Sequence, residues 1–157
     1  MTPPTAVDVF LFEPSYRRIA ERLHENVPNA RITLLTERSE ILIDDKPAAV
    51  EQMRPTAGWA NLDLFGWEKR SDYFRLLLKV GSVRWVQSAA AGVDDPVFGR
   101  LAERGILLTN SDAQGPSIAD YIMGAVLDYF QTGDERRRLQ AQHEWRRIPA
   151  REIGGTR

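Results

Sequence analysis

Short apolar runs alternate along this sequence with segments whose apolar residues recur at helical spacing, and this alternation restricts the possible folds more than any other feature. The runs of strand length are Val7–Phe12, Arg31–Leu35, Ile41–Ile43, Val83–Gln87 and Ile106–Thr109. The helical patterns are Pro14–Asn26, Trp67–Lys79, Asp95–Gly105 and Ser117–Phe130. Strands that alternate with helices favour a mostly parallel sheet with helices on both faces. Because crossovers between parallel strands are right-handed, we expect a flavodoxin-like, doubly wound α/β fold.

Several shorter signals refine this expectation. Pro47–Met53 predicts a weak helix, and Pro55–Gly66 predicts a short strand followed by a loop. Asp95–Pro96 is typical of a helix start, with an N-cap acceptor before a proline in the first turn. Gly105 is typical of the left-handed residue that follows a helix. Ser117–Asp120 has the spacing of a capping box, with Asp120 at its third helical position.

The character of the chain changes after Phe130. Arginines become frequent between Asp134 and Arg157, and apolar residues become few. We therefore expect one α/β domain over residues 1–112, followed by a helix and an arginine-rich tail over residues 113–157. A solvated helix face or a subunit contact is the favoured interpretation of the tail, because acidic residues interrupt its positive charge.

Composition excludes some classes of function. The formal net charge of −1 gives no overall field that attracts nucleic acid or an anionic membrane, so neither partner is expected. The absence of cysteine excludes disulfides and thiolate metal sites, and it fits the predicted cytoplasmic location. No apolar run approaches the ~20 residues of a membrane span, and the first residues lack the pattern of a signal peptide. His24 and His143 stand far apart, so no histidine metal site is expected.

Two loops follow predicted strands at positions where doubly wound sheets bind ligands. They are Ser88–Asp94 and Asn110–Pro116, and the first consists almost entirely of small residues. Small side chains let a ligand approach the backbone, and consecutive peptide N–H groups in a turn bind anions such as a carboxylate. The same residues also suit a tight turn from a strand into a helix, so both interpretations stay open at this point.

Three ordered segments resemble the D-2-hydroxyacid dehydrogenase family. Arg84–Asp94 (RWVQSAAAGVD) is similar to the family's LKWVQS-x-(S/G)-A-G-V-D, and Leu101–Asn110 (LAERGILLTN) to its L-x-x-R-G-I-x-(L/V)-T-N. Gln114–Tyr121 (QGPSIADY) is similar to x-G-P-x-I-A-E-(H/Y). The first 80 residues match the family only in the alternation of predicted strands and helices.

The resemblance implies a substrate site. In that family the backbone of the (S/G)-A-G turn holds the carboxylate of a small 2-oxo or 2-hydroxy acid, which here implicates Ala90, Ala91 and Gly92 through their peptide N–H groups. Ala90 stands where serine or glycine is frequent, so no hydroxyl contact is expected from it. Residues 1–112 would then be the substrate-binding domain of an oxidoreductase that uses NAD or NADP.

The resemblance places the rest of the chemistry elsewhere. The family's catalytic histidine, its carboxylate, its arginine and the G-x-G-x-x-G fingerprint lie in or after a cofactor domain. Arg151–Arg157 resembles the sequence motif that precedes that domain in the family. We therefore expect NAD or NADP to be held by a missing domain that would follow Arg157. Neither His24 nor His143 is then a catalytic candidate, and this chain alone is expected to be inactive.

Other functions and an assembly follow from the same residues. A non-catalytic flavodoxin-like binding or interaction module derived from the family is the alternative. A receiver-type signalling domain is disfavoured, because Glu13 stands alone after the first strand and no lysine follows Lys79. Apolar side chains of the Ser117–Phe130 helix, such as Ile122 and Val126, predict association, and a homodimer is expected.

Overall fold

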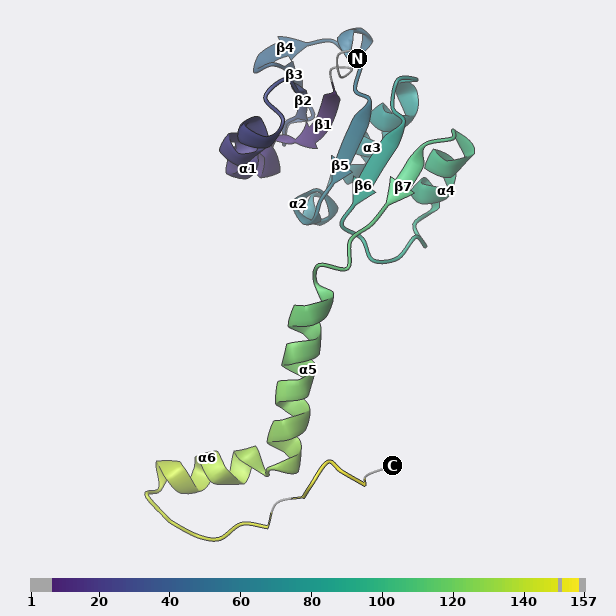
Figure 1. Ribbon diagram of the computed structural model, residues 1–157. Coiled ribbons are helices and arrows are strands. Elements are labelled where there is room, and N and C mark those ends of the chain that lie inside the picture. Colours follow the sequence, from purple (N-terminus) through teal and green to yellow (C-terminus); the bar gives the residue numbers. More distant parts are fainter. Residues whose placement is uncertain (1–6, 150, 156–157) are drawn as a thin grey trace. The chain divides into compact units, whose positions relative to one another are not determined.

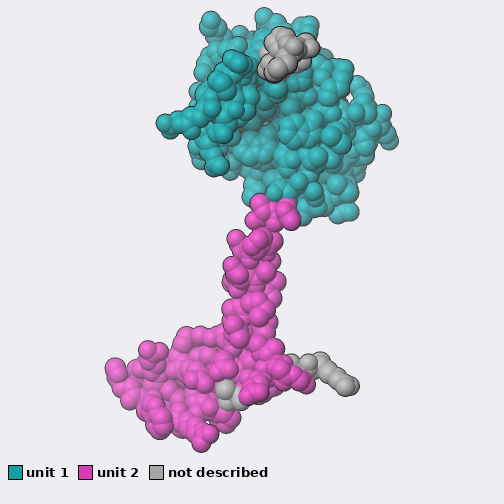
Figure 2. Space-filling view, viewed as in Figure 1, with its two compact units in different colours: residues 1–111 teal, residues 112–157 magenta. Residues whose placement is uncertain are grey.

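A computed structural model describes residues 7–149 and 151–155 of the chain (Figure 1). Residues 1–6, considered above for a signal peptide, lie outside the described residues, as do Ala150 and the last two residues of the C-terminal motif. The chain divides into two compact units, residues 1–111 and 112–157 (Figure 2).

The described part of unit 1 contains a seven-stranded sheet in the order β4-β3-β2-β1-β5-β6-β7 (Figure 1). Its strands are β1 (Asp8–Phe12), β2 (Arg31–Leu35), β3 (Ile41–Ile43), β4 (Lys46–Ala48), β5 (Ala57–Ala60), β6 (Trp85–Ser88) and β7 (Leu107–Thr109). Strands β2, β1, β5, β6 and β7 are parallel to one another, and β3 and β4 add an antiparallel edge. The parallel strands follow the flavodoxin-like order, so the predicted α/β fold is confirmed.

The antiparallel edge corrects the helix predicted over Pro47–Met53. Asp44 and Asp45 have φ angles of 49° and 62°, which both lie in the left-handed region. Two such residues form the tight turn that matches the twist of paired strands, so the chain folds back as a β3–β4 hairpin. What remains of the expected helix is a short 3-10 turn, Val50–Gln52.

Unit 1 has helices α1 (Glu13–Asn26), α2 (Leu62–Gly66), α3 (Arg70–Lys79) and α4 (Pro96–Glu103). Helix α2 corrects the loop expected after β5. The Asn61 side chain accepts a hydrogen bond of 3.1 Å from the Leu64 N–H, and this cap starts a helix in a segment too short to show helical periodicity.

Both predicted ends of α4 are confirmed. The Asp95 carboxylate accepts a hydrogen bond of 2.9 Å from the Val97 N–H. At the other end Gly105 has a φ of 71°, and the Ile106 N–H donates to the Leu101 carbonyl at 3.1 Å. This pattern is a Schellman motif, which favours a residue without a Cβ at the left-handed position.

Apolar side chains pack on both faces of the sheet, because successive residues of a strand point to opposite sides. Along β1, Phe10 belongs to a large cluster with α2, α3 and α4, whereas Leu11 belongs to a smaller cluster with Tyr16 of α1. Helices therefore cover both faces, as predicted.

Tyr73 anchors α3 to the centre of the sheet. Its hydroxyl donates a 2.8 Å hydrogen bond to the Phe10 carbonyl, and its ring stacks on the Phe10 ring at 4.4 Å. Burial raises the pKa of the Tyr73 phenol, so the donor stays protonated. Gly58 of β5 permits this approach, because a Cβ there would lie 3.0 Å from the Tyr73 hydroxyl oxygen.

Replacement of Tyr73 by phenylalanine should lower the free energy of unfolding by about 1 kcal/mol, because one buried hydrogen bond is lost. Gly58→Ala should cost about 2 kcal/mol through overpacking. In the Tyr73→Phe background the alanine methyl meets no hydroxyl and only the close contact with Leu77 at 3.1 Å remains, so the two costs should be non-additive by up to about 1 kcal/mol in urea denaturation. Gly81→Ala is the control, because a methyl group added at that position would have no neighbour within 4 Å. Costs that simply add would contradict this account.

Asp8, at the start of β1, is a buried carboxylate with incomplete partners. Its Oδ1 accepts a 2.8 Å hydrogen bond from the Thr33 hydroxyl, while Oδ2 is buried without a hydrogen bond among the described residues. The Arg31 Nε lies 3.9 Å from this oxygen. Burial raises the pKa of the Asp8 carboxyl above its ordinary value, and the Thr33 hydrogen bond and the Arg31 charge oppose this rise.

A raised pKa in the folded state means that Asp8 favours folding when it is protonated. This contribution is present below the unfolded pKa of about 3.9 and is lost as pH rises through the higher folded value. Asp8→Asn should therefore become progressively more stable relative to the original chain as pH increases from about 3 to 7. Urea denaturation across this range measures the difference, with Glu103→Gln on the exposed end of α4 as control. A pH-independent difference would exclude the proposed burial effect.

The described part of unit 2 contains helices α5 (Gly115–Phe130) and α6 (Gly133–Ala141). Helix α5 corrects the capping box predicted at Ser117–Asp120, since the helix begins three residues earlier, at Gly115, and no side chain caps it. Pro116 lies in the first turn, where its fixed φ and missing N–H suit a helix start. Asp120 therefore lies inside the helix. No helix among the described residues is long and apolar enough to cross a membrane.

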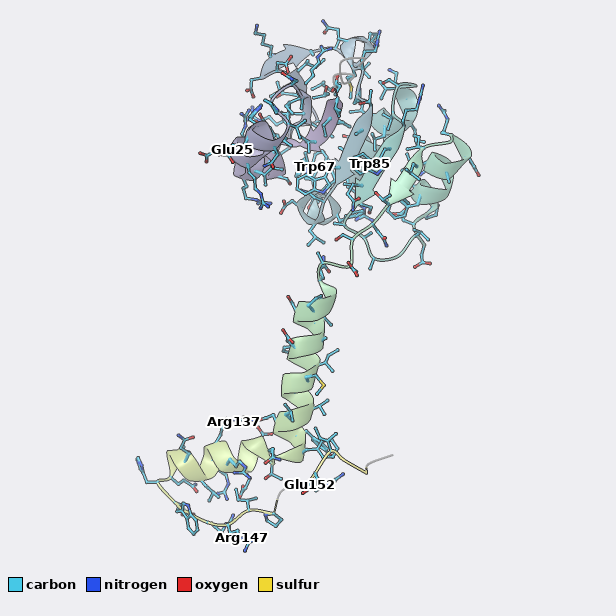
Figure 3. The ribbon with its side chains drawn as sticks, in the orientation of Figure 1. Glu25, Trp67, Trp85, Arg137, Arg147 and Glu152 are labelled. Carbon is cyan, nitrogen blue, oxygen red and sulfur yellow. The ribbon has the colours of Figure 1, made fainter. Side chains whose placement is uncertain are left out.

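Three arginines of unit 2, Arg137, Arg138 and Arg146, are paired with carboxylates inside the unit. Arg137 holds both oxygens of Asp128 at 2.7 and 2.8 Å, and it also contacts Asp134 at 2.6 Å (Figure 3). Arg138, with Arg146 as a second partner, lowers the pKa of Glu135 to about 2. These pairs support the interpretation of the tail as a solvated, self-compensated surface; the absence of a nucleic-acid partner stays a prediction.

Candidate carboxylate-binding site

The small-residue loop predicted as a site lies between β6 and α4, over residues 89–95. It follows the carboxyl end of β6, and its neighbour β7 ends at the same edge because the two strands are parallel. This edge is where doubly wound sheets bind ligands. The predicted residues Ala90, Ala91 and Gly92 are consecutive in the loop, and their role stays a prediction.

The peptide N–H groups of the loop are not equivalent. The Ala89 N–H donates to the Ala60 carbonyl at 2.8 Å, which continues the sheet by one residue. The Ala90 N–H donates to the Ser88 hydroxyl at 3.1 Å. Among the described residues, the N–H groups of Ala91 and Gly92 have no hydrogen-bond acceptor. The N–H groups of Val93, Asp94 and Asp95 have none either among the described residues, so Ala91 and Gly92 are the two free donors within the predicted Ala90–Gly92 turn.

Two side chains outside the predicted site residues Ala90, Ala91 and Gly92 hold this loop in place. Ser88 is buried and accepts from Ala90, and the Asn110 side-chain amide donates to the Ala91 carbonyl at 3.0 Å. Asn110 begins the second loop at the same sheet edge, and that shared edge was the available signal. Its bond to Ala91 fixes the backbone beside the two free donors.

Further polar contacts fix the ends of β6 and β7. The Trp85 indole N–H donates to the Thr109 hydroxyl at 2.7 Å, and that hydroxyl donates to the Gln87 side-chain oxygen at 2.6 Å. Both strands therefore present their loops in a defined register.

A small cavity of about 110 Å³ opens beside the loop. It is lined by Ser88, Ala90, Gly92, Val93, Leu108, Thr109 and Asn110. None of these lining residues has an ionisable side chain, so the cavity offers hydrogen bonds and apolar contact without a general acid or base. Such a cavity suits binding and orientation of a small molecule.

Asp94 opposes anion binding at this place. A Cβ on Gly92 would lie 3.0 Å from the Asp94 Oδ2, so this carboxylate occupies the space next to the free Gly92 peptide. Like charges about 4 Å apart repel by about 1 kcal/mol even in water. The two N–H dipoles therefore stabilise a bound carboxylate, and the negative charge of Asp94 destabilises it.

The described residues do not fit a dinucleotide. In dinucleotide-binding folds the first strand–helix turn is rich in glycine, so that a pyrophosphate can approach the helix N-terminus. Here the turn from β1 to α1 is formed by Phe12, Glu13 and Pro14, and Glu13 places a carboxylate in the first helical turn. Steric bulk and negative charge both disfavour pyrophosphate.

His24 is not among the residues that line the loop cavity. The Nε2 atom of His24 is 3.0 Å from the Tyr16 hydroxyl on α1, and His143 follows α6 in unit 2. No group of three or more metal-ligating side chains among the described residues can hold a metal ion.

Comparison with known proteins gives a structural likeness. No family model matches the sequence, and no curated protein matches it. The fold is similar to a D-lactate dehydrogenase from Treponema pallidum, with a TM-score of 0.55 and 14% sequence identity. The match covers 91% of this chain and 41% of that enzyme, so this chain spans about two fifths of the dehydrogenase. At this identity the likeness shows a shared fold with part of such an enzyme.

Removal of the Asn110 side-chain amide should loosen the loop without unfolding unit 1. In Asn110→Ala the Ala91 carbonyl loses its donor, and we expect faster hydrogen exchange at the amides of residues 90–93, with the melting temperature nearly unchanged. Asn110→Asp is the matched variant, because it keeps the size but replaces the donor by a charge that repels the carbonyl. Exchange that stays unchanged in both variants would show that Asn110 does not position the loop.

Proposed function

We propose that this chain is the substrate-binding part of an NAD(P)-dependent oxidoreductase that interconverts 2-oxo acids and D-2-hydroxy acids. The observation that carries the proposal is the pair of free N–H groups at Ala91 and Gly92, in a loop at the carboxyl edge of the sheet. The sequence of this loop resembles that of D-2-hydroxyacid dehydrogenases. The structural likeness to part of a D-lactate dehydrogenase supports the same proposal.

In this proposal the described residues bind and orient the acid. The Ala91 and Gly92 N–H groups hold the carboxylate, while Ser88 and Asn110 keep the loop in shape. Ala90 contributes backbone shape, because its N–H is already used by Ser88. Residues 1–112 would be the substrate-binding domain, and residues 113–157 would lead from it to a cofactor domain.

Hydride and proton transfer are assigned to residues outside the loop cavity. Reduction of a 2-oxo acid needs a hydride at the carbonyl carbon and a proton at its oxygen, and the reduced cofactor, NADH or NADPH, would supply the hydride when bound. The cavity lining holds no acid that donates this proton, and the β1–α1 turn does not fit the pyrophosphate of the cofactor. The same lining also favours the alternative, a non-catalytic module that binds small acids.

Carboxylate binding is testable by NMR on the full chain. Titration with glyoxylate should shift the amide resonances of Ala91 and Gly92, and pyruvamide, which has a carbonyl but no carboxylate, should not. Asp94→Asn removes the opposing charge and should tighten glyoxylate binding roughly 3- to 10-fold, as expected for about 1 kcal/mol of repulsion. Glu103→Gln makes the same charge change at the far end of α4 and should leave affinity unaltered.

Three outcomes would count against the proposal. Equal shifts with pyruvamide would show that the loop does not recognise a carboxylate. Shifts confined to residues remote from Ala91 and Gly92 would place the acid elsewhere. A glyoxylate affinity that is the same in the original chain and in Asp94→Asn would show that the bound carboxylate is not beside Gly92.

A further inference from the structure

Two arginines that precede neighbouring strands of unit 1 are fixed to the backbone in the same way. The Arg54 Nη1 donates to the carbonyls three residues and one residue before it, at 2.7 and 2.6 Å. The Arg84 Nη1 donates to the carbonyls at the same two positions before it, at 2.8 and 3.1 Å. The backbone that leads into β5 and into β6 therefore determines where each guanidinium lies.

Both arginines leave the same edge of the guanidinium unused. In the part of the chain that the structure describes, the Nε and Nη2 atoms of Arg54 and Arg84 have no partner. This edge is a planar fork of N–H donors that matches two oxygens of one anion. Elsewhere in the chain Arg138 uses this fork to hold both oxygens of Glu135, each at 2.8 Å. Because Nη1 already fixes Arg54 and Arg84, an anion at either fork orders little further side chain.

The two arginines lie at the amino edge of the sheet, where β5 and β6 begin side by side (Figure 1). Ala57 is paired with Trp85, and the Arg84 N–H extends this pairing by donating to the Thr56 carbonyl at 2.9 Å. Arg54 stands two residues before Thr56. Since the strands are parallel, this edge is opposite to the carboxyl edge that carries the loop of residues 89–95.

A cavity of about 450 Å³ opens at the same place. Its lining comes from the turn before β5 and from the end of α3 with the residues that follow that helix. Arg54 and Lys79 supply positive charge, whereas Val50 and Val80 supply apolar surface that continues into the core. The volume lies in the range of small-molecule sites. The cavity therefore has room for an anionic group together with an organic body.

Ser82 adds a hydroxyl that has no hydrogen bond in the folded chain. Its Oγ is buried and unpartnered among the described residues, although the residue lines the cavity. A buried polar atom without a partner costs free energy, so it calls for an explanation. Rotation about the Cα–Cβ bond to another staggered position would let this hydroxyl donate to a ligand in the cavity.

The charge around the cavity matches a dianion. Glu51 is the one acidic side chain of the lining, and its Oε1 lies 3.9 Å from the Lys79 Nζ in an exposed pair. Arg54 and Lys79 outweigh it by one charge, and Arg84 adds another through its bond to the carbonyl of Gly81, a lining residue. A phosphate monoester carries about −1.5 to −2 at neutral pH and has three acceptor oxygens. A single carboxylate would leave part of the positive charge unpaired.

We propose that this cavity binds a small phosphate monoester. The fork of Arg54 holds two phosphate oxygens, Lys79 and the Ser82 hydroxyl reach the third, and the organic body lies against Val50 and Val80. Free phosphate uses the charges but not the apolar surface, so the ester should bind more tightly. This site is at the opposite edge of the sheet from the candidate carboxylate-binding site, and it does not depend on the function proposed for that loop.

Calorimetric titration of the full chain with phenyl phosphate tests this site. Phenyl phosphate should bind more tightly than inorganic phosphate, and phenol should not bind. Arg54→Lys keeps the charge but removes the fork, and should weaken binding about 10-fold. Arg22→Lys makes the same change on the exposed face of α1 and should leave affinity unaltered. Glu51→Gln removes the opposing charge and should tighten binding roughly 3-fold.

NMR locates the ligand in the same samples. Phenyl phosphate should shift the amide resonances of Gly81 and Ser82 and leave those of Ala91 and Gly92 in place. Equal affinity for inorganic phosphate would overturn the assignment to an ester. Equal losses in Arg54→Lys and Arg22→Lys would show attraction by general charge instead of a fork. An affinity that Glu51→Gln does not raise would show that the phosphate lies outside this cavity, and that result does not require Arg54→Lys to fold.

Discussion

The contact between Tyr73 and β1 determines where the rest of unit 1 lies. It fixes α3 over the centre of the sheet through one buried hydrogen bond and one ring stack. The close approach needs a glycine at position 58 of β5, because a methyl there would meet the hydroxyl oxygen at 3.0 Å. Strand β6 pairs with β5, and the loop after β6 begins where that pairing ends. The candidate site thus depends on packing that is centred two strands away.

Much of this architecture could be predicted from local patterns. Parallel strands appear as apolar runs, and the ends of α4 follow from Asp95 and Gly105, whose chemistry acts within one helical turn. Errors arose where a short segment is decided by contacts elsewhere. The hairpin turn at Asp44 and Asp45 lacks the glycine that usually marks such turns, and α2 is too short to show a period. Pairing with β3 decided the first case, and the Asn61 cap decided the second.

In the candidate site, too, some features could be predicted from local sequence and others could not. A strand followed by small residues predicted a ligand loop at Ser88–Asp94, and the family resemblance selected Ala90, Ala91 and Gly92 within it. Which peptide groups are free depends on side chains that the spacing of small residues does not reveal. Ser88 uses the Ala90 N–H from two residues away, and Asn110 reaches Ala91 from the next strand. Helix α4 and strand β7 separate Asn110 from Ala91 along the chain, so no local pattern in the sequence reports that contact.

The charges around this loop explain why it does not form a complete anion-binding site by itself. A helix N-terminus usually attracts anions, and α4 begins directly after the loop. Asp95, however, already accepts from the first turn of α4, and Asp94 adds a second carboxylate beside Gly92. The favourable end of the helix is therefore largely neutralised within the chain. Two peptide N–H groups can orient a carboxylate beside Asp94 and Asp95, but they do not neutralise the charge of that carboxylate. If the loop binds an acid as proposed, efficient binding calls for a positive charge from residues beyond the cavity lining.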